Sequence, residues 1–376
     1  MAEKLMAGNY VDGGQTDEQI YAAGCLKAFR IDGEAILCRN FGNGHINDTY
    51  LVVDETARSY ILQRINKNVF RDPIGVMQNI VAVINHLQQT AKTVRNVLEL
   101  VPTQSGDMWH MDGCGDVWRL YTFISDSVCY QLPKSMEIFQ KSGAAFGAFQ
   151  KSMSDFPAHM LIETIPNFHN TPVRYDAFNA ALNKDAYDRA RIAKYEVEFA
   201  IERENYAGTL MKGNMDGIIP LRVTHNDTKL NNVLFDRRTS DYLCVIDLDT
   251  VMPGFSLTDF GDSIRFGAST ALEDEKDLSK VSFSIGMFEA YAEGFLSECG
   301  SSLTDGEIWH LCDGAIIITL ETGLRFLTDY ISGDTYFKTA YDGHNLDRCR
   351  TQFKLVADME AAKGKMMRII ENIMHR

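Results

Sequence analysis

A short strand-forming stretch, residues 223–251, restricts the fold of this chain more than any other feature, because it interrupts a long run of helical patterns. It begins with the polar sequence VTHNDTKLNN, and two apolar, strand-like runs follow, NVLFD and LCVIDLD. The polar residues RRTS at 237–240 separate the two runs and predict a turn. A polar loop therefore leads directly into a hairpin, and two aspartates stand at its end.

The polar residues of this stretch have the spacing and the chemistry of a phosphoryl-transfer site. They follow the pattern H-x-D-x-K-x-x-N and then D-x-D: His225, Asp227, Lys229, Asn232, Asp247 and Asp249. A hydroxyl nucleophile needs a carboxylate to orient it and accept its proton, the transferred phosphate needs a cation, and Mg²⁺ prefers amide and carboxylate oxygens. We predict Asp227 as the base and Lys229 as the cation. Asn232 and Asp247 are the predicted Mg²⁺ ligands, with Asp249 assisting.

A loop without chemistry is the competing interpretation, because Asp and Asn side chains often hydrogen-bond to nearby backbone in turns. The joint pattern of Asp, Lys, Asn and a following I-D-x-D favours a kinase catalytic loop. An Asp-Phe-Gly sequence begins downstream at Asp259, but no hairpin strand directly precedes it. We therefore expect Asp259 and Asp262 to be structural acceptors behind the site, and His225 to hold the loop by hydrogen bonds.

The pattern of elements divides the chain near residue 126. A single core stops growing at about 250–300 residues, so 376 residues predict two lobes. Strand-like runs and turns alternate over residues 33–124 around one helical pattern that starts at Asp72-Pro73, and another helix is expected near residues 17–29. After Ser125-Asp126-Ser127, helical patterns dominate, at residues 134–153, 176–214, 278–298 and 305–332. We predict an α+β, two-lobed, protein-kinase-like fold. Residues 1–126 would form a small antiparallel sheet with one helix, and residues 127–376 a larger, mainly helical lobe.

Composition excludes several classes of partner. The net charge is −14 and the pI is near 5.1, so the chain has no long-range positive field to attract nucleic acid or anionic lipid. The N-terminal sequence MAEKLMAGNYVDGGQ has no apolar segment, and the apolar runs elsewhere are too short to span a bilayer. The eight cysteines form no C-x-x-C pair. These features lead us to expect a cytoplasmic enzyme with reduced thiols and no membrane partner, and no pattern specifies an oligomeric state.

The first lobe contains the candidate nucleotide-binding residues. The turn Gly42-Asn43-Gly44 between two predicted strands can cover the phosphates of ATP with backbone amides, although glycines also serve turn geometry alone. The third strand reads Ile-Leu-Gln63-Arg64 where kinases carry a lysine, and the helix at 73–90 contains no Asp or Glu. The lysine–glutamate pair of kinases is therefore missing. Strand alternation places Gln63 and Arg64 on opposite faces, and either can meet the phosphates.

Several segments resemble one family of sugar kinases. HNDTKLNNVLFD followed by VIDLDTVMPGFSLTDFGDSIRFG resembles the catalytic segment of N-acetylhexosamine 1-kinases, which belong to the aminoglycoside phosphotransferase and choline kinase superfamily. The similarity extends to FGNGHINDTYLV, SYILQRIN and LETGLRFLTDYISGDTYF, so it covers most of residues 41–337. The resemblance implies that ATP and N-acetylglucosamine or N-acetylgalactosamine give the α-1-phosphate and ADP.

The resemblance also implies roles for single residues. Asp227 would be the base for the anomeric hydroxyl, with Asn232 and Asp247 holding Mg²⁺. Adenine would lie against the segment 121–124, which includes Tyr121 and Phe123. The other predicted sugar contacts are His45, Phe266, Arg325 and Tyr336.

Each sugar contact has an alternative interpretation. His45 can be a solvated or capping residue after the hairpin turn, and Phe266 and Tyr336 can be core aromatics. Arg325 lies on the apolar stripe of a predicted helix, where Glu321 one turn earlier can pair with it. The alternatives for the whole chain are a kinase for another small hydroxyl compound, such as an aminoglycoside, choline or homoserine, and an inactive, sugar-binding pseudokinase.

Overall fold

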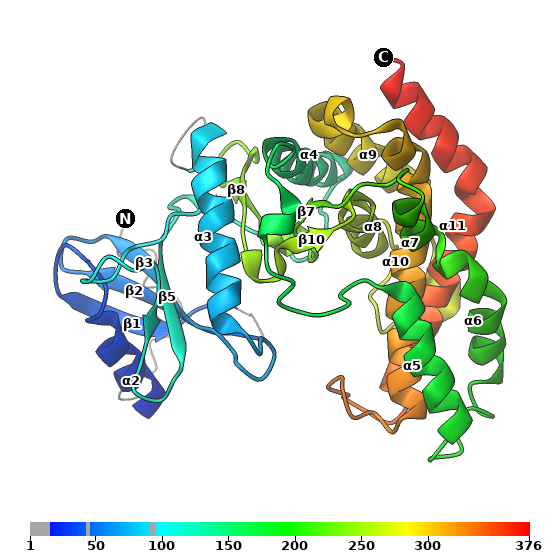
Figure 1. Ribbon diagram of the computed structural model, residues 1–376, viewed down its shortest axis with the longest axis horizontal. Coiled ribbons are helices and arrows are strands. Elements are labelled where there is room, and N and C mark those ends of the chain that lie inside the picture. Colours follow the sequence, from blue (N-terminus) through cyan, green and yellow to red (C-terminus); the bar gives the residue numbers. More distant parts are fainter. Residues whose placement is uncertain (1–15, 43–45, 91–94) are drawn as a thin grey trace. The chain divides into compact units, whose positions relative to one another are not determined.

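The computed structural model of the chain describes residues 16–42, 46–90 and 95–376. Residues fall into two compact units on either side of the Asp126–Ser127 bond. The first unit carries a five-stranded sheet and the second is mainly helical (Figure 1). This confirms the predicted α+β class, with an antiparallel sheet first and a helical part after it.

The sheet of the first unit has the strand order β1-β2-β3-β5-β4, and all neighbouring strands are antiparallel. Its strands are β1 (Ala35–Asn40), β2 (Asp48–Asp54), β3 (Ser59–Arg64), β4 (His110–Met111) and β5 (Val117–Thr122). Helix α3 (Pro73–Thr90) follows β3 in the chain. Between β3 and β5, Gln63 is paired with Arg119 and Arg64 with Trp118.

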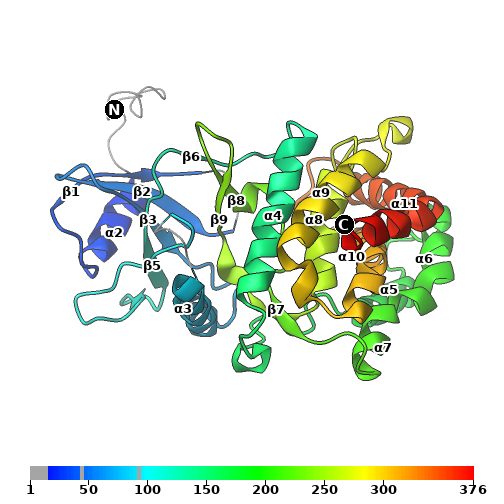
Figure 2. The ribbon, with the colours of Figure 1, turned by 90° about the horizontal axis from the view of Figure 1, so that it is seen from above.

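A further helix, α2 (Asp17–Leu26), begins at Thr16 with a capping box completed by Gln19. Its residues Cys25 and Leu26 share a hydrophobic core with Leu62 and Trp118 of the sheet, so α2 covers one face of it (Figures 1 and 2). The predicted helix near residues 17–29 is confirmed, and its role is to close that face.

The second unit contains eight α-helices among the residues that the structure describes: α4 (Met136–Ser152), α5 (Thr171–Lys184), α6 (Lys194–Ala207), α7 (Thr209–Met215), α8 (Ser256–Gly267), α9 (Ile285–Cys299), α10 (Asp305–Ile331) and α11 (His344–Met374). The helical pattern predicted over 176–214 is wrong as one element, because Asp185 takes a left-handed conformation that ends α5. Helix α10 agrees with the prediction for 305–332, since Thr304 and Glu307 form a capping box at its start. No helix in the described ranges has the length and apolarity needed to cross a membrane.

Helix α10 lies at the centre of this unit and packs against α5, α8 and α11, while α4, α8 and α9 lie side by side (Figure 2). The backbones of α8 and α10 approach closely, because a Cβ atom at Gly261 would lie 2.6 Å from the carbonyl oxygen of Gly314. Two glycines, Gly261 and Gly314, therefore allow the backbones of α8 and α10 to cross in close contact.

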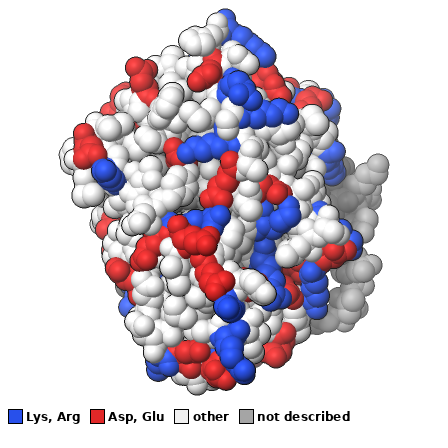
Figure 3. Space-filling model, turned by 90° about the vertical axis from the view of Figure 1, so that its right-hand side faces the viewer, with Lys and Arg blue, Asp and Glu red and all other residues white. Residues whose placement is uncertain are grey.

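The strands of the second unit are short. β6 (Ser127–Val128), β8 (Val233–Asp236) and β9 (Tyr242–Val245) form one sheet, and β7 (Arg222–Thr224) pairs with β10 (Met252–Gly254). The predicted hairpin is the β8–β9 pair. Lys, Arg, Asp and Glu side chains are interspersed over the face of the molecule in Figure 3 and do not form one basic surface there.

Candidate active site

The β8–β9 hairpin brings the two halves of the polar pattern together. Val233 is paired with Val245, and the Ile246 N–H donates to the Asn232 carbonyl oxygen at 2.9 Å. Asn232 and Asp247 therefore stand at the same end of the hairpin. Asp247 adopts a left-handed conformation, with φ at 62°, and the chain turns there into a short 3₁₀ helix.

Asp227 is held by two side chains of its own loop. Asn232 Nδ2 donates to the Asp227 carbonyl oxygen at 2.9 Å and to its Oδ2 at 3.1 Å. Lys229 Nζ lies 3.0 Å from Asp227 Oδ1, and the charge of this carboxylate raises the pKa of Lys229. The Asp227 side chain keeps 30% of its surface exposed, so a solute can still reach the carboxylate. Because Asn232 donates through its nitrogen, its amide oxygen is the atom left for a cation.

His225 supports this loop from behind, as predicted. Its ring is fully buried against the rings of Phe146 and Phe149. His225 Nε2 lies 2.9 Å from the Ile246 carbonyl oxygen, and Nδ1 accepts from the Asp227 N–H at 3.3 Å. These partners fit the neutral tautomer with the proton on Nε2. One imidazole thus ties the backbone of the candidate base to the hairpin.

Asp259 is a structural acceptor, which confirms its prediction. Its carboxylate accepts from the His225 and Asn226 N–H groups, both at 2.8 Å, and from Gln150 Nε2 at 2.9 Å. Asn226 has φ at 64°, a conformation that these bonds to its backbone stabilise. Burial raises the pKa of the Asp259 carboxyl, while its hydrogen bonds lower it. The Asp-Phe-Gly sequence therefore shapes the loop from behind it.

His169 is a second residue that supports the loop around Asp227, and no sequence pattern identified it. His169 Nδ1 lies 3.1 Å from Glu321 Oε1 and Nε2 lies 3.3 Å from the Asn226 carbonyl oxygen. Both partners are acceptors, so only the doubly protonated imidazolium can donate to both. Burial lowers the pKa of His169, but the hydrogen bond and charge of Glu321 outweigh it and leave the pKa above its ordinary value. His169 thereby connects α10 to the residue before Asp227.

The ion pair between Glu321 and Arg325, which is the alternative to a sugar contact, does not form. Glu321 is 1% exposed and accepts from His169 and from Thr171 Oγ1 at 2.7 Å. No ion pair joins it to Arg325 in the described part of the chain. The Arg325 guanidinium lies 5.4 Å from the centre of the Phe337 ring. The i,i+4 spacing permitted the pair, but Glu321 is hydrogen-bonded instead by His169 and Thr171, which are distant in the sequence.

The predicted sugar contacts fall in two places in the second unit. Tyr336 is 74% exposed, and its ring lies 4.7 Å from that of Phe337, next to Arg325. Phe266, on α8, lies in the lining of a cavity that does not include Asp227. His45 lies outside the described residues.

In the first unit, the Arg64 guanidinium forms ion pairs with two carboxylates. Its Nη2 lies 2.6 Å from Asp48 Oδ2, its Nη1 lies 3.5 Å from Asp116, and its guanidinium lies 5.7 Å from the centre of the Trp118 ring. Trp118 belongs to the face that α2 covers. Gln63 lies on the opposite face, where its Oε1 accepts from Arg119 Nε at 3.0 Å. Gln63 and Arg119, whose side chain is 1% exposed, therefore lie on the face of the sheet away from α2.

The remaining nucleotide candidates lie around β5. Tyr121 is buried and stacks near the guanidinium of Arg119, at 5.3 Å. Phe123 donates its N–H to the Ser59 carbonyl oxygen, and its ring meets that of Phe41 edge-on at 6.0 Å. Gly42 follows Phe41 with φ at 79°, a value that favours glycine. Asn43 and Gly44 lie outside the described residues.

The candidate metal ligands are one amide and two carboxylates. Asp247 is exposed and Asp249 is 3% exposed. The described residues contain no group of three or more His, Cys, Asp or Glu side chains that could hold a metal ion by themselves. Mg²⁺ usually keeps several waters and binds one or two carboxylates plus substrate phosphates. The small donor set of Asn232, Asp247 and Asp249 fits that mode of binding.

The sequence matches one family model. The phosphotransferase enzyme family, APH, matches residues 38–284, which is well over half of the chain. The matched region includes the whole polar loop and the hairpin.

Solved structures share the fold. An aminoglycoside phosphotransferase from Alicyclobacillus acidocaldarius subsp. acidocaldarius DSM 446 has a TM-score of 0.63 at 11% identity, covering 97% of this chain and 99% of that one. An amicoumacin kinase in complex with AMP-PNP, Ca²⁺ and Ami has a TM-score of 0.59 at 14% identity, covering 94% and 96%. A choline kinase from Cryptosporidium parvum Iowa II has a TM-score of 0.56 at 14% identity, covering 96% and 100%. The predicted protein-kinase-like fold is thereby confirmed.

Proposed function

The chain belongs to the phosphotransferase enzyme family APH, and from this premise we propose that it transfers the terminal phosphate of ATP to the anomeric hydroxyl of an N-acetylhexosamine. The products would be ADP and the α-1-phosphate of N-acetylglucosamine or N-acetylgalactosamine. The observation that supports transfer to a hydroxyl is the Asp227 carboxylate, held by Asn232 and Lys229 at the end of a hairpin that also carries Asp247.

In this proposal Asp227 orients the acceptor hydroxyl and accepts its proton. Asn232 fixes one carboxylate oxygen, Oδ2, so the rotation of Asp227 is restricted before the acceptor arrives. Lys229 is held in the charged form by Asp227 and can also contact the transferred phosphoryl group. Asn232, Asp247 and Asp249 would hold Mg²⁺, which supplies charge neutralisation at the phosphates of ATP.

Charge in the second unit supports a neutral acceptor. Three basic groups lie around Glu321: His169 bonds to it, and the charges of Arg174 and Arg325 interact with it, while Asp262 is a second carboxylate whose charge acts on His169. Burial lowers the pKa of Arg174, and Glu321, Arg325 and Tyr336 all act on it electrostatically, which places these groups in one cluster. A cationic acceptor would be repelled by this cluster. An acetamido sugar carries no charge and offers oxygens that arginine can donate to.

The sugar contacts of the proposal are Arg325 and Tyr336 from this cluster, with Phe266 and His45. An exposed aromatic ring such as Tyr336 can cover one face of a pyranose ring. On the nucleotide side, the proposal uses the turn at Gly42, the residue Gln63 on the sheet face away from α2, and the segment containing Tyr121 and Phe123.

The test is ADP release with N-acetylglucosamine, N-acetylgalactosamine, glucose, choline and kanamycin. We expect the largest kcat/KM with the two N-acetylated sugars. In Asp227→Asn the rate falls by about 10²–10⁴-fold, the contribution of a general base. Asp216→Asn, an exposed aspartate on the same unit, is the matched control and keeps the wild-type rate. Equal turnover with choline would exclude the sugar assignment, and the absence of ADP release with every acceptor would favour an inactive sugar-binding protein.

A further inference from the structure

The loop that joins α10 to α11 begins with a segment, residues 335–337, whose backbone is bound by a single side chain, that of Asp329 on α10 (Figure 1). The Thr335 and Tyr336 N–H groups donate to Asp329 Oδ1 at 2.9 and 2.8 Å. The Phe337 N–H donates to Asp329 Oδ2 at 2.9 Å. Because Asp329 is 4% exposed, three consecutive backbone donors converge on one buried carboxylate.

Helix α10 does not need this carboxylate to end. Gly333 has φ at 95°, and its N–H donates to the Tyr330 carbonyl oxygen at 3.1 Å. The Asp334 N–H donates to the Asp329 carbonyl oxygen at 2.8 Å, which completes a Schellman motif. Both bonds join backbone groups only. The Asp329 side chain therefore acts on the residues that follow the motif, and its role is separate from helix termination.

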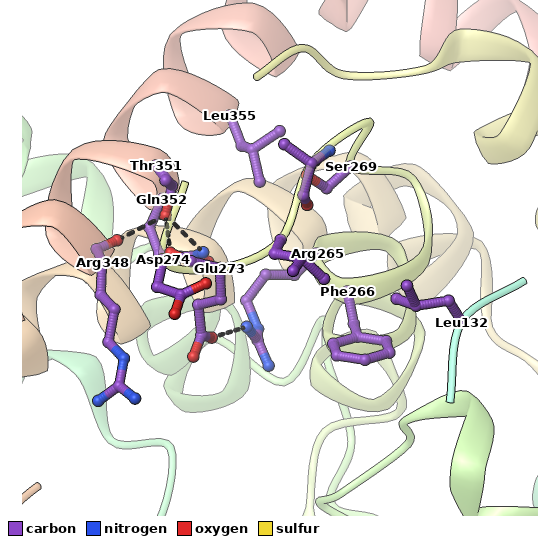
Figure 4. Close-up of a pocket in the computed structure, with 12 residues that line it drawn as sticks. Leu132, Arg265, Phe266, Ser269, Glu273, Asp274, Arg348, Thr351, Gln352 and Leu355 are labelled. Atoms are coloured by element: carbon purple, nitrogen blue, oxygen red, sulfur yellow. Dashed lines mark hydrogen bonds and ion pairs between the residues drawn. The ribbon is translucent and has the colours of Figure 1, made fainter. Parts of the chain in front are cut away.

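Asn345, near the start of α11, holds the Asp329 carboxylate from another side. It is fully buried, and its Nδ2 donates to Asp329 Oδ2 at 2.9 Å and to Asp334 Oδ1 at 2.8 Å. Its Oδ1 accepts from Arg348 Nη1 at 3.4 Å, which agrees with this orientation of the amide. In Figure 4 the Arg348 side chain extends away from Phe266. Helix α11 thus fixes the carboxylate and leaves it directed at the segment.

Hydrogen bonds alone compensate the burial of the Asp329 charge, since no cation pairs with it in the described part of the chain. A buried charge is costly unless it is satisfied, and bonds to an ionised acceptor are roughly twice as strong as bonds between neutral groups. A carboxylate offers about four acceptor positions, and three backbone N–H groups and one amide occupy them. Asp329 can therefore act through the segment and not by touching a ligand.

The segment carries two aromatic rings with different roles. The Tyr336 ring is exposed, as expected for a side chain that meets a ligand. The Phe337 ring packs against buried Phe326, with 4.7 Å between ring centres, and the Arg325 guanidinium lies 5.4 Å from the centre of the Phe337 ring. The backbone of residues 335–337 thus determines where the Tyr336 ring lies and what Arg325 packs against.

We propose that Asp329 is a positioning residue of the acceptor site, whose carboxylate holds residues 335–337 in the conformation that presents Tyr336 to the acceptor and keeps Phe337 beside Arg325. This inference rests on the proposed function, because Arg325 and Tyr336 are acceptor contacts only in that proposal. Since the segment is fixed in advance, the acceptor does not have to order it on binding, and the free-energy cost of binding is lower.

The test is Asp329→Asn in steady-state kinetics, with the acceptor that gives the highest kcat/KM in the ADP-release assay. Asparagine keeps one oxygen, so its NH₂ group faces donors where the carboxylate accepts. We expect KM for the acceptor to rise about tenfold, while kcat at saturating acceptor and KM for ATP stay within about twofold. Asp342→Asn, with a side chain 94% exposed in the same loop, is the matched control and keeps all three constants.

A double variant shows whether the effect passes through the segment. In a Tyr336→Ala background, Asp329→Asn should raise the acceptor KM by less than about threefold further, because both changes remove the same contact. Asn345→Ala is a milder second variant in case Asp329→Asn does not fold. It removes one of the donors to the carboxylate and should raise the acceptor KM about threefold.

An unchanged acceptor KM in folded Asp329→Asn overturns the proposal, and so does an equal rise of both KM values or a fall in kcat alone. If choline or kanamycin is the best acceptor, the sugar assignment fails, while the two KM values for that acceptor and ATP still decide the role of Asp329. If no compound is turned over, the Kd of N-acetylglucosamine from calorimetric titration replaces KM. An unchanged Kd, or no binding to either protein, then overturns the proposal.

Discussion

Replacement of His169 by asparagine should loosen the catalytic loop from α10 and make the stability of the helical unit less dependent on pH. Asparagine is the suitable replacement because His169 has φ at 54°, a left-handed conformation that Asn tolerates better than most residues. Its shorter side chain cannot reach both Glu321 Oε1 and the Asn226 carbonyl oxygen. The change therefore breaks the link and adds little backbone strain.

The expected loss of stability depends on the partners that Glu321 keeps in the variant. Removing one member of a buried charge pair costs about 3–5 kcal/mol. We expect the lower end, about 3 kcal/mol, because Thr171 Oγ1 still donates to Glu321 and the charge of Arg325 still acts on it. For domains of 150–250 residues this corresponds to a fall in Tm of about 6–12 °C.

The contribution of His169 to the stability of the folded protein depends on pH with a definite sign. The pKa of His169 is raised in the folded protein above the ordinary value of about 6.5, through its hydrogen bond to Glu321, although burial opposes the charge. The stabilisation is therefore complete below about pH 6.5 and is lost as the pH rises through the raised pKa. The difference in Tm between wild type and His169→Asn should be larger near pH 6 than near pH 9.

The assay is differential scanning calorimetry at both pH values, with exposed His159→Asn as the control. Steady-state kinetics accompany it, because the link ends at Asn226, next to the candidate base. We expect kcat to fall while KM for ATP stays within about twofold. A difference in Tm that is the same at both pH values would refute the imidazolium assignment, and an unchanged Tm would refute the link itself.

The other predictions concern cation and metal positions. Gln63→Leu should raise KM for ATP about tenfold, while Arg64→Gln changes it less than about twofold, because Arg64 is bound to carboxylates on the face that α2 covers. The reverse order would place the phosphates on the Arg64 face. Arg325→Gln should raise KM for N-acetylglucosamine about tenfold and leave KM for ATP unchanged, and equal effects on both would count against an acceptor contact. Asp247→Asn should lower kcat by at least about 10²-fold at fixed Mg²⁺ and be partly restored by more Mg²⁺; a wild-type rate would remove Asp247 from the metal site.

Local patterns made much of the fold predictable. Strand alternation and turn residues located the antiparallel sheet, and the capping residues Thr304 and Glu307 located the start of α10. The loop and the hairpin were predictable because Asp227, Asn232 and Asp247 are separated only by a short loop and two paired strands. In such a segment, spacing alone determines which side chains meet.

Features that depend on distant parts of the chain were not predictable in this way. His169 and Glu321 are 152 residues apart, and no local pattern connects them. Strand alternation put Gln63 and Arg64 on opposite faces, but only the packing of α2 shows that the Arg64 face is the one it covers. Helix α8 is buried on nearly all sides, and the polar Asp259 in its sequence SLTDFGDSIRFG is satisfied by the distant His225 and Asn226 N–H groups, which no local pattern shows.

The most direct test of the central claim is a single-turnover measurement of phosphoryl transfer from ATP to N-acetylglucosamine by Asp227→Asn, together with the Kd for ATP and Mg²⁺. We expect a Kd close to that of the wild type and a transfer rate lower by about 10²–10⁴-fold, since only the carboxylate proposed to accept the proton has been removed. Transfer at the wild-type rate, with the sugar 1-phosphate still formed, would contradict it.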